Sequence, residues 1–253
     1  MQMYKFVHYK MKGEEVIQHI VNWLSEYQKK SGANGFVIGV SGGIDSAVTS
    51  TICALTGMKT FVISMPIKQV KIQDDLSKTH CNWLEEKFKN IEVKNISLDS
   101  VFDQFQNALS NYNSEHVYAN SKARIRMTTL YQVAGSSNGI VVGTGNKVED
   151  FGVGFYTKYG DGGVDISPIA DCTKTQIWEM GKELKISDDI IKAEPTDGLW
   201  LDGRTDASQL GMTYQELEEA IKNQKDKNHK KYLEIRKKNL HKMLSIPVCK
   251  MDE

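Results

Sequence analysis

The chain has 253 residues, 40% of them hydrophobic and 25% charged, so it is long enough to bury a full core. Its 32 basic and 32 acidic residues give a formal net charge of zero, which excludes a whole-molecule field that would capture nucleic acid or an anionic membrane. No apolar run approaches the ~18 residues of a membrane span. The four cysteines lack CxxC or zinc-site spacing; they are Cys53, Cys81, Cys172 and Cys249. We therefore expect a globular cytoplasmic protein that binds neither nucleic acid nor membrane.

Strand-like and helix-like patterns alternate along the chain. Helices are expected over 14–29, from Asp45, and over 72–88, 100–110 and about 119–135. Strands are expected over 35–40, 60–66, 91–98 and 139–143. Helical stretches of ten or more residues between strands imply parallel pairing through right-handed crossovers. The predicted fold is therefore α/β, with a doubly wound parallel sheet flanked by helices in one domain over residues 1–253.

The segment FVIGVSGGIDS (36–46) runs from a predicted buried strand through paired glycines into a helix with an Asp or Ser cap. Such a junction directs several free backbone N–H groups at one point, which suits a phosphate. The segment has neither the GxGxxG spacing of a Rossmann fold nor the GK[ST] ending of a P-loop. A glycine turn capped by Asp45 is the simpler alternative.

Ligands of doubly wound parallel sheets lie beyond the carboxyl ends of the strands. The strand exits at 40–46, 64–66 and 143–149 could therefore share one site.

The pattern SGGxDS (41–46) resembles the loop of the ATP pyrophosphatases, enzymes of the adenine-nucleotide alpha-hydrolase-like fold that cleave ATP between its α and β phosphates. In that role Gly42 and Gly43 let the backbone approach the pyrophosphate. Ser41 and Ser46 add hydroxyl donors, and Asp45 can hold Mg²⁺.

Three further segments narrow this resemblance. They are VVGTGNKVEDFGVGFYTKYGDGGVDISPIADCTKTQ (141–176), NSKARIRM (120–127) and EPT (194–196). Together they look like an ammonia-dependent NAD⁺ synthetase, over most of the chain from Gly39 to Lys242. The resemblance implies an α/β homodimer that uses Mg·ATP to adenylate the nicotinate carboxylate of deamido-NAD⁺, after which ammonia displaces AMP. It also implies a synthetase domain without a glutaminase domain, so that ammonia is the direct nitrogen donor.

The resemblance also implies site residues. It places ATP on Gly39, Val40, Ser41, Gly42, Gly43, Ile44, Asp45, Ser46, Thr144, Lys174 and Thr196. It places Mg²⁺ on Asp45 and Glu149, and deamido-NAD⁺ on Arg124, Lys158, Asp165, His241 and Lys242. Asp161 is placed to bind or deprotonate the incoming ammonium.

The chemistry suits the residues assigned to ATP and Mg²⁺. Asp45 and Glu149, at separate strand exits, could bridge one hard cation against phosphate oxygens. Attack of a carboxylate on the α-phosphorus brings two anions together, so cations must screen the approach. The sequence Thr173 to Gln176 has the form of a capping box, which puts Lys174 in the first turn of a helix. A capped helix with a surface Lys is the simpler alternative.

The segment YGDGGVDI (159–166) allows two interpretations. An isolated GDGG is usually an ordinary tight turn. The catalytic interpretation rests on ammonia chemistry: NH₄⁺ dominates at neutral pH, but only NH₃ is nucleophilic. A carboxylate such as Asp161 can receive the cation and accept its proton.

The substrate residues come from distant parts of the sequence. Lys122, Arg124 and Arg126 alternate within a helical stretch and cannot all share one face, and Arg124 is the residue expected to serve the substrate. His241 and Lys242 lie far along the chain from Arg124, so we expect each dinucleotide site to be built across a two-fold interface.

The sequence departs from the family pattern at two positions. Two alternative functions also stay open. Met243 stands where relatives commonly have a basic residue, and Ala207 follows Asp206 where relatives often have Glu in a mobile acidic loop. A tRNA-modifying or GMP-forming ATP pyrophosphatase shares SGGxDS but should lack TKYGDGGVDI. A non-enzymatic nucleotide-binding module of the same fold would bind ATP without turnover.

Overall fold

The computed structural model describes residues 13–196, 198–200 and 204–251, so both ends of the predicted domain lie outside the described residues. Its centre is a four-stranded sheet with the order β3-β2-β1-β4, and every pair of neighbours is parallel. The strands are β1 (Gly35–Gly39), β2 (Lys59–Ser64), β3 (Ile91–Asn95) and β4 (Gly139–Val142). All four predicted strands are confirmed, although β3 ends at Asn95, before the predicted end at 98. β2 ends at Ser64, before the predicted end at 66, where Pro66 has no N–H for a strand ladder.

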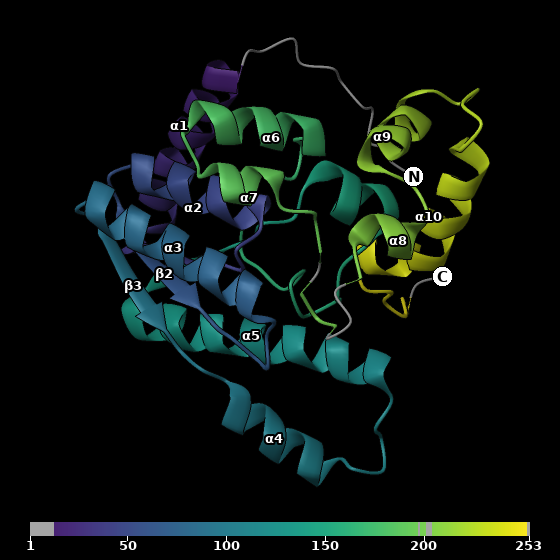
Figure 1. Cartoon of the computed structure of the whole chain (residues 1–253), viewed down its shortest axis with the longest axis horizontal. Helices are drawn as coiled ribbons and strands as arrows, with labels where there is room; N and C mark the ends of the chain where they lie inside the picture. The colour runs from purple at the N-terminus through teal and green to yellow at the C-terminus, as the bar shows by residue number, and fades with distance from the viewer. Residues whose placement is uncertain (1–12, 197, 201–203, 252–253) are drawn as a thin grey trace.

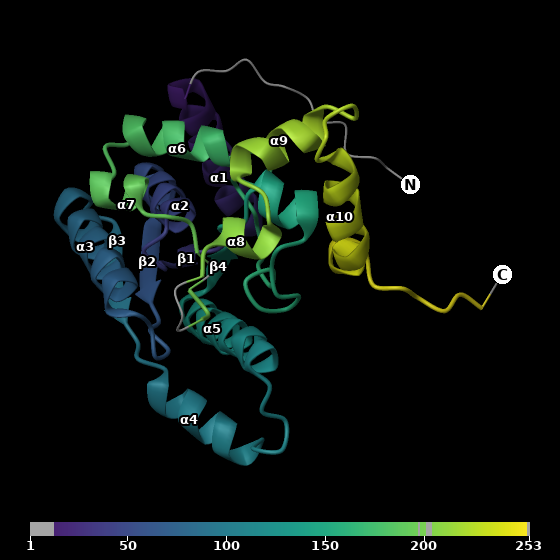
Figure 2. The same cartoon turned by 45° about the vertical axis from the view of Figure 1, so that its right-hand side comes forward.

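Helices cover both faces of the sheet (Figures 1 and 2). One face is covered by α1 (Gly13–Ser31), α2 (Ile44–Leu55), α3 (Lys71–Lys87), α6 (Lys174–Glu183) and α7 (Asp188–Lys192). The other face is covered by α4 (Asp99–Ala108) and α5 (Glu115–Ser137). The doubly wound fold is thus confirmed, and the winding direction reverses between β1 and β4, which is where such sheets bind ligands.

The period of two along β1 separates two hydrophobic clusters. Phe36 and Ile38 pack on the face of α2, whereas Val37 packs with Ile63 and Ala134 on the face of α5. All of these side chains are buried. The central strand therefore anchors both faces of the sheet and fixes the position of the loop that follows it.

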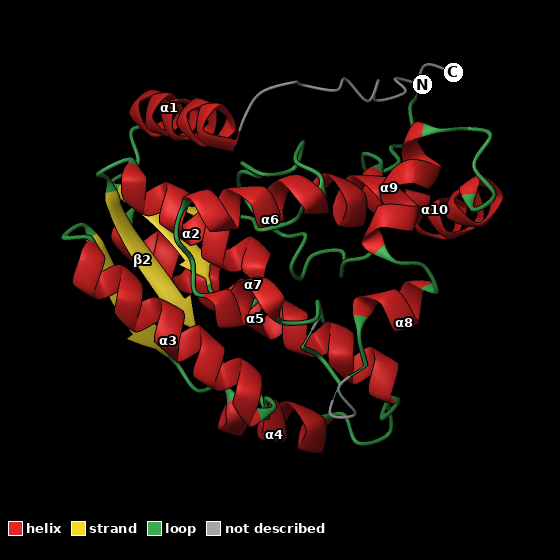
Figure 3. Cartoon of the chain, turned by 45° about the horizontal axis from the view of Figure 1, so that its top comes forward, coloured by secondary structure: helices red, strands yellow, loops and turns green. Residues whose placement is uncertain are grey.

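A third hydrophobic cluster is formed by helices that lie beside the sheet rather than on it (Figure 3). It is formed by the π-helix η1 (Lys147–Val153) together with α8 (Asp206–Leu210), α9 (Tyr214–Lys222) and α10 (His229–Met243). We call residues 204–243 the helical region. Trp178 of α6 packs against this third cluster and also against the cluster on the α2 face. The helical region is therefore joined to the sheet through an apolar contact.

The four cysteines carry free thiols. Cys53, Cys81 and Cys172 are buried free thiols, and Cys249 is an exposed free thiol. Within the described ranges, every helix is too short or too polar to cross a bilayer.

Candidate active site

The loop between β1 and α2 is held by its own hydroxyl groups. Ser46 Oγ lies 3.2 Å from Ser41 Oγ and donates to the carbonyl oxygen of Gly43 at 2.9 Å. Gly42 has a φ of 91°, and a Cβ there would lie 2.6 Å from the carbonyl oxygen of Gln73, so only glycine fits.

The start of α2 differs from the prediction. Gly43, rather than an Asp or Ser, is the N-cap residue, and no side chain caps the helix. The predicted side-chain cap is therefore wrong, because Asp45 turns its carboxylate toward other partners. An uncapped first turn offers its backbone N–H groups to an anion.

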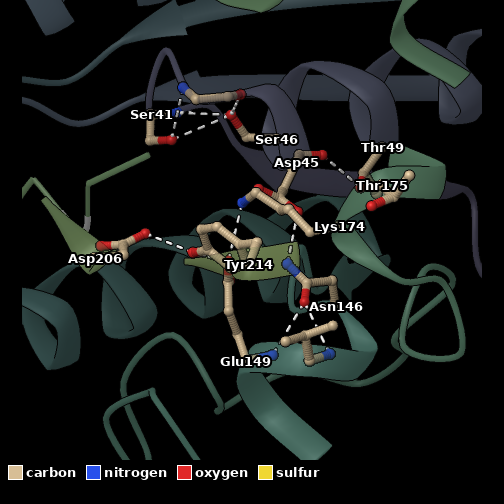
Figure 4. Close-up of polar contacts among 12 residues, drawn as sticks. Ser41, Asp45, Ser46, Thr49, Asn146, Glu149, Lys174, Thr175, Asp206 and Tyr214 are labelled. Carbon is tan, nitrogen blue, oxygen red and sulfur yellow. Dashed lines mark hydrogen bonds and ion pairs between the residues drawn. The ribbon is translucent and has the colours of Figure 1, made fainter. Parts of the chain in front are cut away.

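Lys174 lies between two carboxylates at the strand ends (Figure 4). Its Nζ is 2.5 Å from Asp45 Oδ2 and 2.9 Å from Glu149 Oε1. The capping box of Thr173 and Gln176 is confirmed and starts α6 at Lys174. The Lys174 side chain is only 3% exposed, so the alternative of a surface lysine is wrong.

Two residues that the sequence analysis missed complete this cluster. Asn146 donates from Nδ2 to Asp45 Oδ1 at 2.9 Å, while its Oδ1 accepts the backbone N–H of Glu149 at 3.0 Å. The Tyr214 hydroxyl lies 2.5 Å from Glu149 Oε1. Asn146 could have been noticed because it follows a strand exit, whereas only packing brings Tyr214 to the site.

Burial and neighbouring charges act in opposite directions on the pKa values of this cluster. Burial acts to raise the pKa of Glu149, but the charge of Lys174 and the hydroxyl of Tyr214 outweigh it, so the pKa is lowered. Burial acts to lower the pKa of Lys174, but the two carboxylates outweigh it and the pKa is raised. Burial raises the pKa of Asp45, although the charge of Lys174 opposes this. When both acids and the lysine are ionised, the cluster carries one net negative charge and can accept a further cation.

The residues fit a magnesium ion. Asp45 and Glu149 each contact the same ammonium group, so their oxygens converge on one point. Hard carboxylate oxygens suit Mg²⁺, which usually takes one or two carboxylates together with phosphate oxygens and water. Among the described residues there is no group of three or more His, Cys, Asp or Glu that would form an all-protein metal cage.

A cavity of about 980 Å³ opens beyond the carboxyl ends of the strands. Every residue predicted to bind ATP lines it: Gly39, Val40, Ser41, Gly42, Gly43, Ile44, Asp45, Ser46, Thr144, Lys174 and Thr196. Glu149 and Asp161 line it as well. The structure thus brings the predicted nucleotide, metal and ammonia residues to one cavity.

A smaller cavity of about 170 Å³ shares Asp150 and Asp161 with the large one. Asp161 Oδ1 accepts the backbone N–H of Thr157 at 3.0 Å, so one of its oxygens does hold a turn. Desolvation raises the pKa of Asp161, and the hydrogen bond from the Thr157 N–H opposes this shift. Asp150, also missed from the sequence, packs its carboxylate against Gly145. Burial and the charge of Asp161 raise the pKa of Asp150 well above its usual value.

Three of the predicted substrate residues meet within one chain. Arg124 Nη2 donates to the Lys158 carbonyl oxygen at 3.3 Å, and Lys158 Nζ donates to the His241 carbonyl oxygen at 3.0 Å. Their separation along the sequence therefore does not require a second subunit. Lys242 Nζ donates to the carbonyl oxygens of Gly154 and Tyr156 at 2.9 and 2.8 Å.

Asp165 has structural partners of its own. Its Oδ2 accepts the Val141 N–H at 2.8 Å, and its Oδ1 accepts the Tyr131 hydroxyl at 2.9 Å. The carboxylate thereby ties the segment after the GDGG turn to β4. Its contact with the dinucleotide stays a prediction.

Comparisons with known proteins agree with this geometry. The family model for NAD synthase matches residues 16–253. The NH(3)-dependent NAD(+) synthetase of Carboxydothermus hydrogenoformans is 36% identical over 210 residues, which cover 81% of this chain and 84% of the relative. The structure of NMN synthetase from Francisella tularensis is similar with a TM-score of 0.88 and 32% identity, covering 95% of this chain and 99% of that one. NH3-dependent NAD synthetase from Campylobacter jejuni is similar with a TM-score of 0.77 and 26% identity, covering 95% of this chain and 100% of that one. The chain therefore belongs to the NAD synthase family.

Proposed function

We propose that the chain catalyses the ATP-dependent amidation of deamido-NAD⁺ by ammonia to NAD⁺. An oxygen of the nicotinate carboxylate attacks the α-phosphorus of ATP, the bond to the β-phosphate breaks, and pyrophosphate leaves. Ammonia then attacks the acyl carbon, the bond to AMP breaks, and one proton is lost. The observation that carries this proposal is the meeting of Lys174, Asp45 and Glu149 beside the uncapped start of α2, where a triphosphate would lie.

The residues of the cavity have distinct roles in this reaction. Lys174 neutralises one of the two carboxylate charges, so the cluster would present net positive charge to the two anions and to the pyrophosphate once Mg²⁺ is bound. Asp45 and Glu149 would hold Mg²⁺, which neutralises phosphate charge when bound. Asp161 receives ammonium and accepts its proton, helped by a pKa that lies above the usual value for an aspartate.

A second substrate is supported by the comparison with F. tularensis NMN synthetase, whose TM-score of 0.88 exceeds the 0.77 of the C. jejuni NAD synthetase. Amidation that yields NMN starts from nicotinate mononucleotide, which carries the same carboxylate but lacks the adenylate half of deamido-NAD⁺. The same adenylation and ammonolysis would serve either molecule.

One assay tests both candidates. The purified chain is incubated with ATP, Mg²⁺ and ammonium, and with either deamido-NAD⁺ or nicotinate mononucleotide, while the amide, AMP and pyrophosphate are measured. The ratio of the two kcat/KM values identifies the preferred substrate. Absence of amide from both would refute the proposal and favour a nucleotide-binding module. Glutamine in place of ammonium should give no turnover, because the proposed reaction takes free ammonia as its nitrogen donor.

A homodimer is part of the proposal because the family resemblance implies it. Light scattering combined with the same assay tests this: a monomer that is fully active at the working concentration would reject it. The cytoplasmic location stays a prediction.

A further inference from the structure

The hydroxyl of Tyr214 lies between two carboxylates. It is 2.5 Å from Glu149 Oε1 and 2.8 Å from Asp206 Oδ2 (Figure 4). The side chain is buried, with a residue exposure of 4%. A phenol carries one hydroxyl proton, so Tyr214 donates fully to only one of the two carboxylates at a time. The two acids therefore compete for one hydrogen bond.

The competing carboxylates belong to different parts of the cavity. Glu149 is in η1, and the oxygen that faces Tyr214 also accepts Lys174 Nζ at 2.9 Å. Asp206 begins α8, and its backbone N–H donates to the carbonyl oxygen of Pro195 at 3.0 Å. Pro195 precedes Thr196, a residue predicted to bind ATP. Tyr214 thus joins the cation site to the segment that carries Thr196.

The ring of Tyr214 is held firmly enough to serve as a fixed donor. It packs edge-on against Trp178, with ring centroids 6.0 Å apart, and Lys174 Nζ lies 4.7 Å from its centre. Its helix is tied to the first turn of α6, because Thr175 donates from N and from Oγ1 to the carboxylate of Glu218 at 2.9 Å each. Rotation of the hydroxyl redirects the proton without moving the ring.

We propose that Tyr214 is a positioning residue that holds Glu149 for the divalent cation, and that Asp206 sets how firmly it does so by competing for the same proton. The inference rests on the proposed function, since that function assigns the cation to Glu149. Hydrogen bonds to a metal-binding carboxylate fix its orientation, and their loss typically weakens metal binding by one to two orders of magnitude.

Calorimetric titration of Mg²⁺ tests this directly. The protein is first saturated with an ATP analogue that has a methylene group between the α and β phosphates, so that no turnover occurs. Tyr214→Phe should raise the Kd for Mg²⁺ about tenfold, with an unchanged circular dichroism spectrum. Tyr232→Phe is the matched control, because Tyr232 is buried in the same cluster and is not among the contacts of Glu149 that the structure shows. It should leave the Kd unchanged.

A double-mutant cycle isolates the competition. Asp206→Asn replaces a charged acceptor by a weaker, neutral one, so the hydroxyl should turn to Glu149 and the Kd for Mg²⁺ should fall. In the Tyr214→Phe background the same change should have no effect. A Kd raised equally by Asp206→Asn in both backgrounds would overturn the competition.

The outcomes separate this inference from the proposed function. A Tyr214→Phe protein with the Kd of the wild type, in an enzyme that makes amide, overturns the inference alone. A wild-type protein that makes no amide but shows the expected Kd changes overturns the proposed function and retains the positioning role. Absence of Mg²⁺ binding by the wild-type protein and analogue would overturn both.

Discussion

Lys174 and Lys242 both line the cavities and are both partly or fully withdrawn from solvent, but different partners bind them. Lys174, at the strand ends, contacts the carboxylates of Asp45 and Glu149. Lys242, in the helical region, donates to two backbone carbonyl oxygens. A carboxylate cancels the charge of a lysine, whereas a carbonyl dipole leaves most of it in place.

The strand ends around Lys174 and the helical region around Lys242 therefore differ in net charge. Carboxylates raise the pKa of Lys174, whereas burial lowers the pKa of Lys242 although Asp161 and Asp150 act in the opposite direction. The strand-end region, formed by Asp45, Glu149 and Lys174, is therefore suited to a metal cation. The helical region keeps positive charge that is available to an anionic substrate. Substitutions in the two regions should for this reason affect different kinetic constants.

The largest expected effect is that of Lys174→Met. It leaves two partly buried carboxylates facing each other, which should destabilise the fold by about 3–5 kcal/mol and lower turnover by about 10³-fold. Urea unfolding and steady-state assays measure these effects. Lys59→Met is the control, because its ion pair with Glu92 is partly exposed to solvent, and it should cost at most about 1 kcal/mol. Equal effects of the two substitutions would remove the distinction between Lys174 and a surface lysine.

Asp45→Asn and Glu149→Gln test the cation role of the strand-end region. Each keeps the side-chain volume but removes a metal-ligand charge, so Mg²⁺-dependent adenylation should fall by about 10²–10³-fold. Pyrophosphate release and circular dichroism are the measurements. Near-normal kcat at ordinary Mg²⁺ concentrations in either variant would show that the corresponding carboxylate is not a metal ligand.

Asp161→Asn should separate the two half-reactions. Adenylation uses the strand-end region and should proceed, whereas ammonolysis should slow by about 100-fold because the ammonium-binding carboxylate becomes neutral. Higher pH should partly restore the rate by supplying more free NH₃. Rapid quench resolves the two steps. If adenylation slows as much as ammonolysis, Asp161 acts only through its turn contact with Thr157.

Lys242→Met should act on binding rather than chemistry. Loss of its uncancelled charge should raise the KM for the anionic nucleotide substrate about tenfold and leave the Mg²⁺ dependence unchanged. Lys231→Met is the matched control, since Lys231 is an exposed residue of the same helix that also donates to a carbonyl oxygen, that of Gly211 at 2.5 Å. A change in kcat without a change in KM would contradict the assignment of Lys242 to the substrate.

The smallest effect on turnover is expected from His80→Gln, which acts on stability alone. Burial lowers the pKa of His80 from 6.5 to about 4, although a backbone hydrogen bond to Ala47 opposes this, and His80 Nε2 lies 3.0 Å from Ser50 Oγ. Below pH 6.5 His80 is protonated in the unfolded chain, whereas in the folded chain it becomes protonated only below about pH 4. Stability should therefore be complete above pH 6.5 and fall by about 3 kcal/mol as the pH drops to 4. Urea unfolding at several pH values should show a shallower decline for the variant, and parallel declines would exclude His80 as the cause.

The strand-end region could be predicted from the sequence to a large extent. Apolar runs locate the strands, and the glycines of 42–43 and the capping box at Thr173 mark the points where the chain turns into a helix. The predicted Asp or Ser cap failed because Lys174 and Asn146, from distant segments, take the carboxylate of Asp45. Such a choice between local and distant partners is decided by tertiary packing.

The helical region could not be predicted to the same degree. Tyr232 is buried in it and Tyr214 reaches the cation site, and no motif in the sequence indicates either contact. Nothing in the local pattern around Tyr214 distinguishes it from an ordinary first-turn residue. Its role follows from the third hydrophobic cluster, which brings α9 against η1.

Trp178 couples the unfolding of the helical region to that of the sheet. Because its indole packs against the sheet-side cluster and the helical cluster at once, the helical region cannot detach without exposing apolar surface that belongs to the rest of the fold. The two parts should consequently melt in a single cooperative transition, with tryptophan fluorescence and far-ultraviolet ellipticity changing at the same denaturant concentration. Trp178→Ala should uncouple them, so that the helical region frays first and takes Tyr214 and Lys242 out of reach of the cavity while the sheet remains intact.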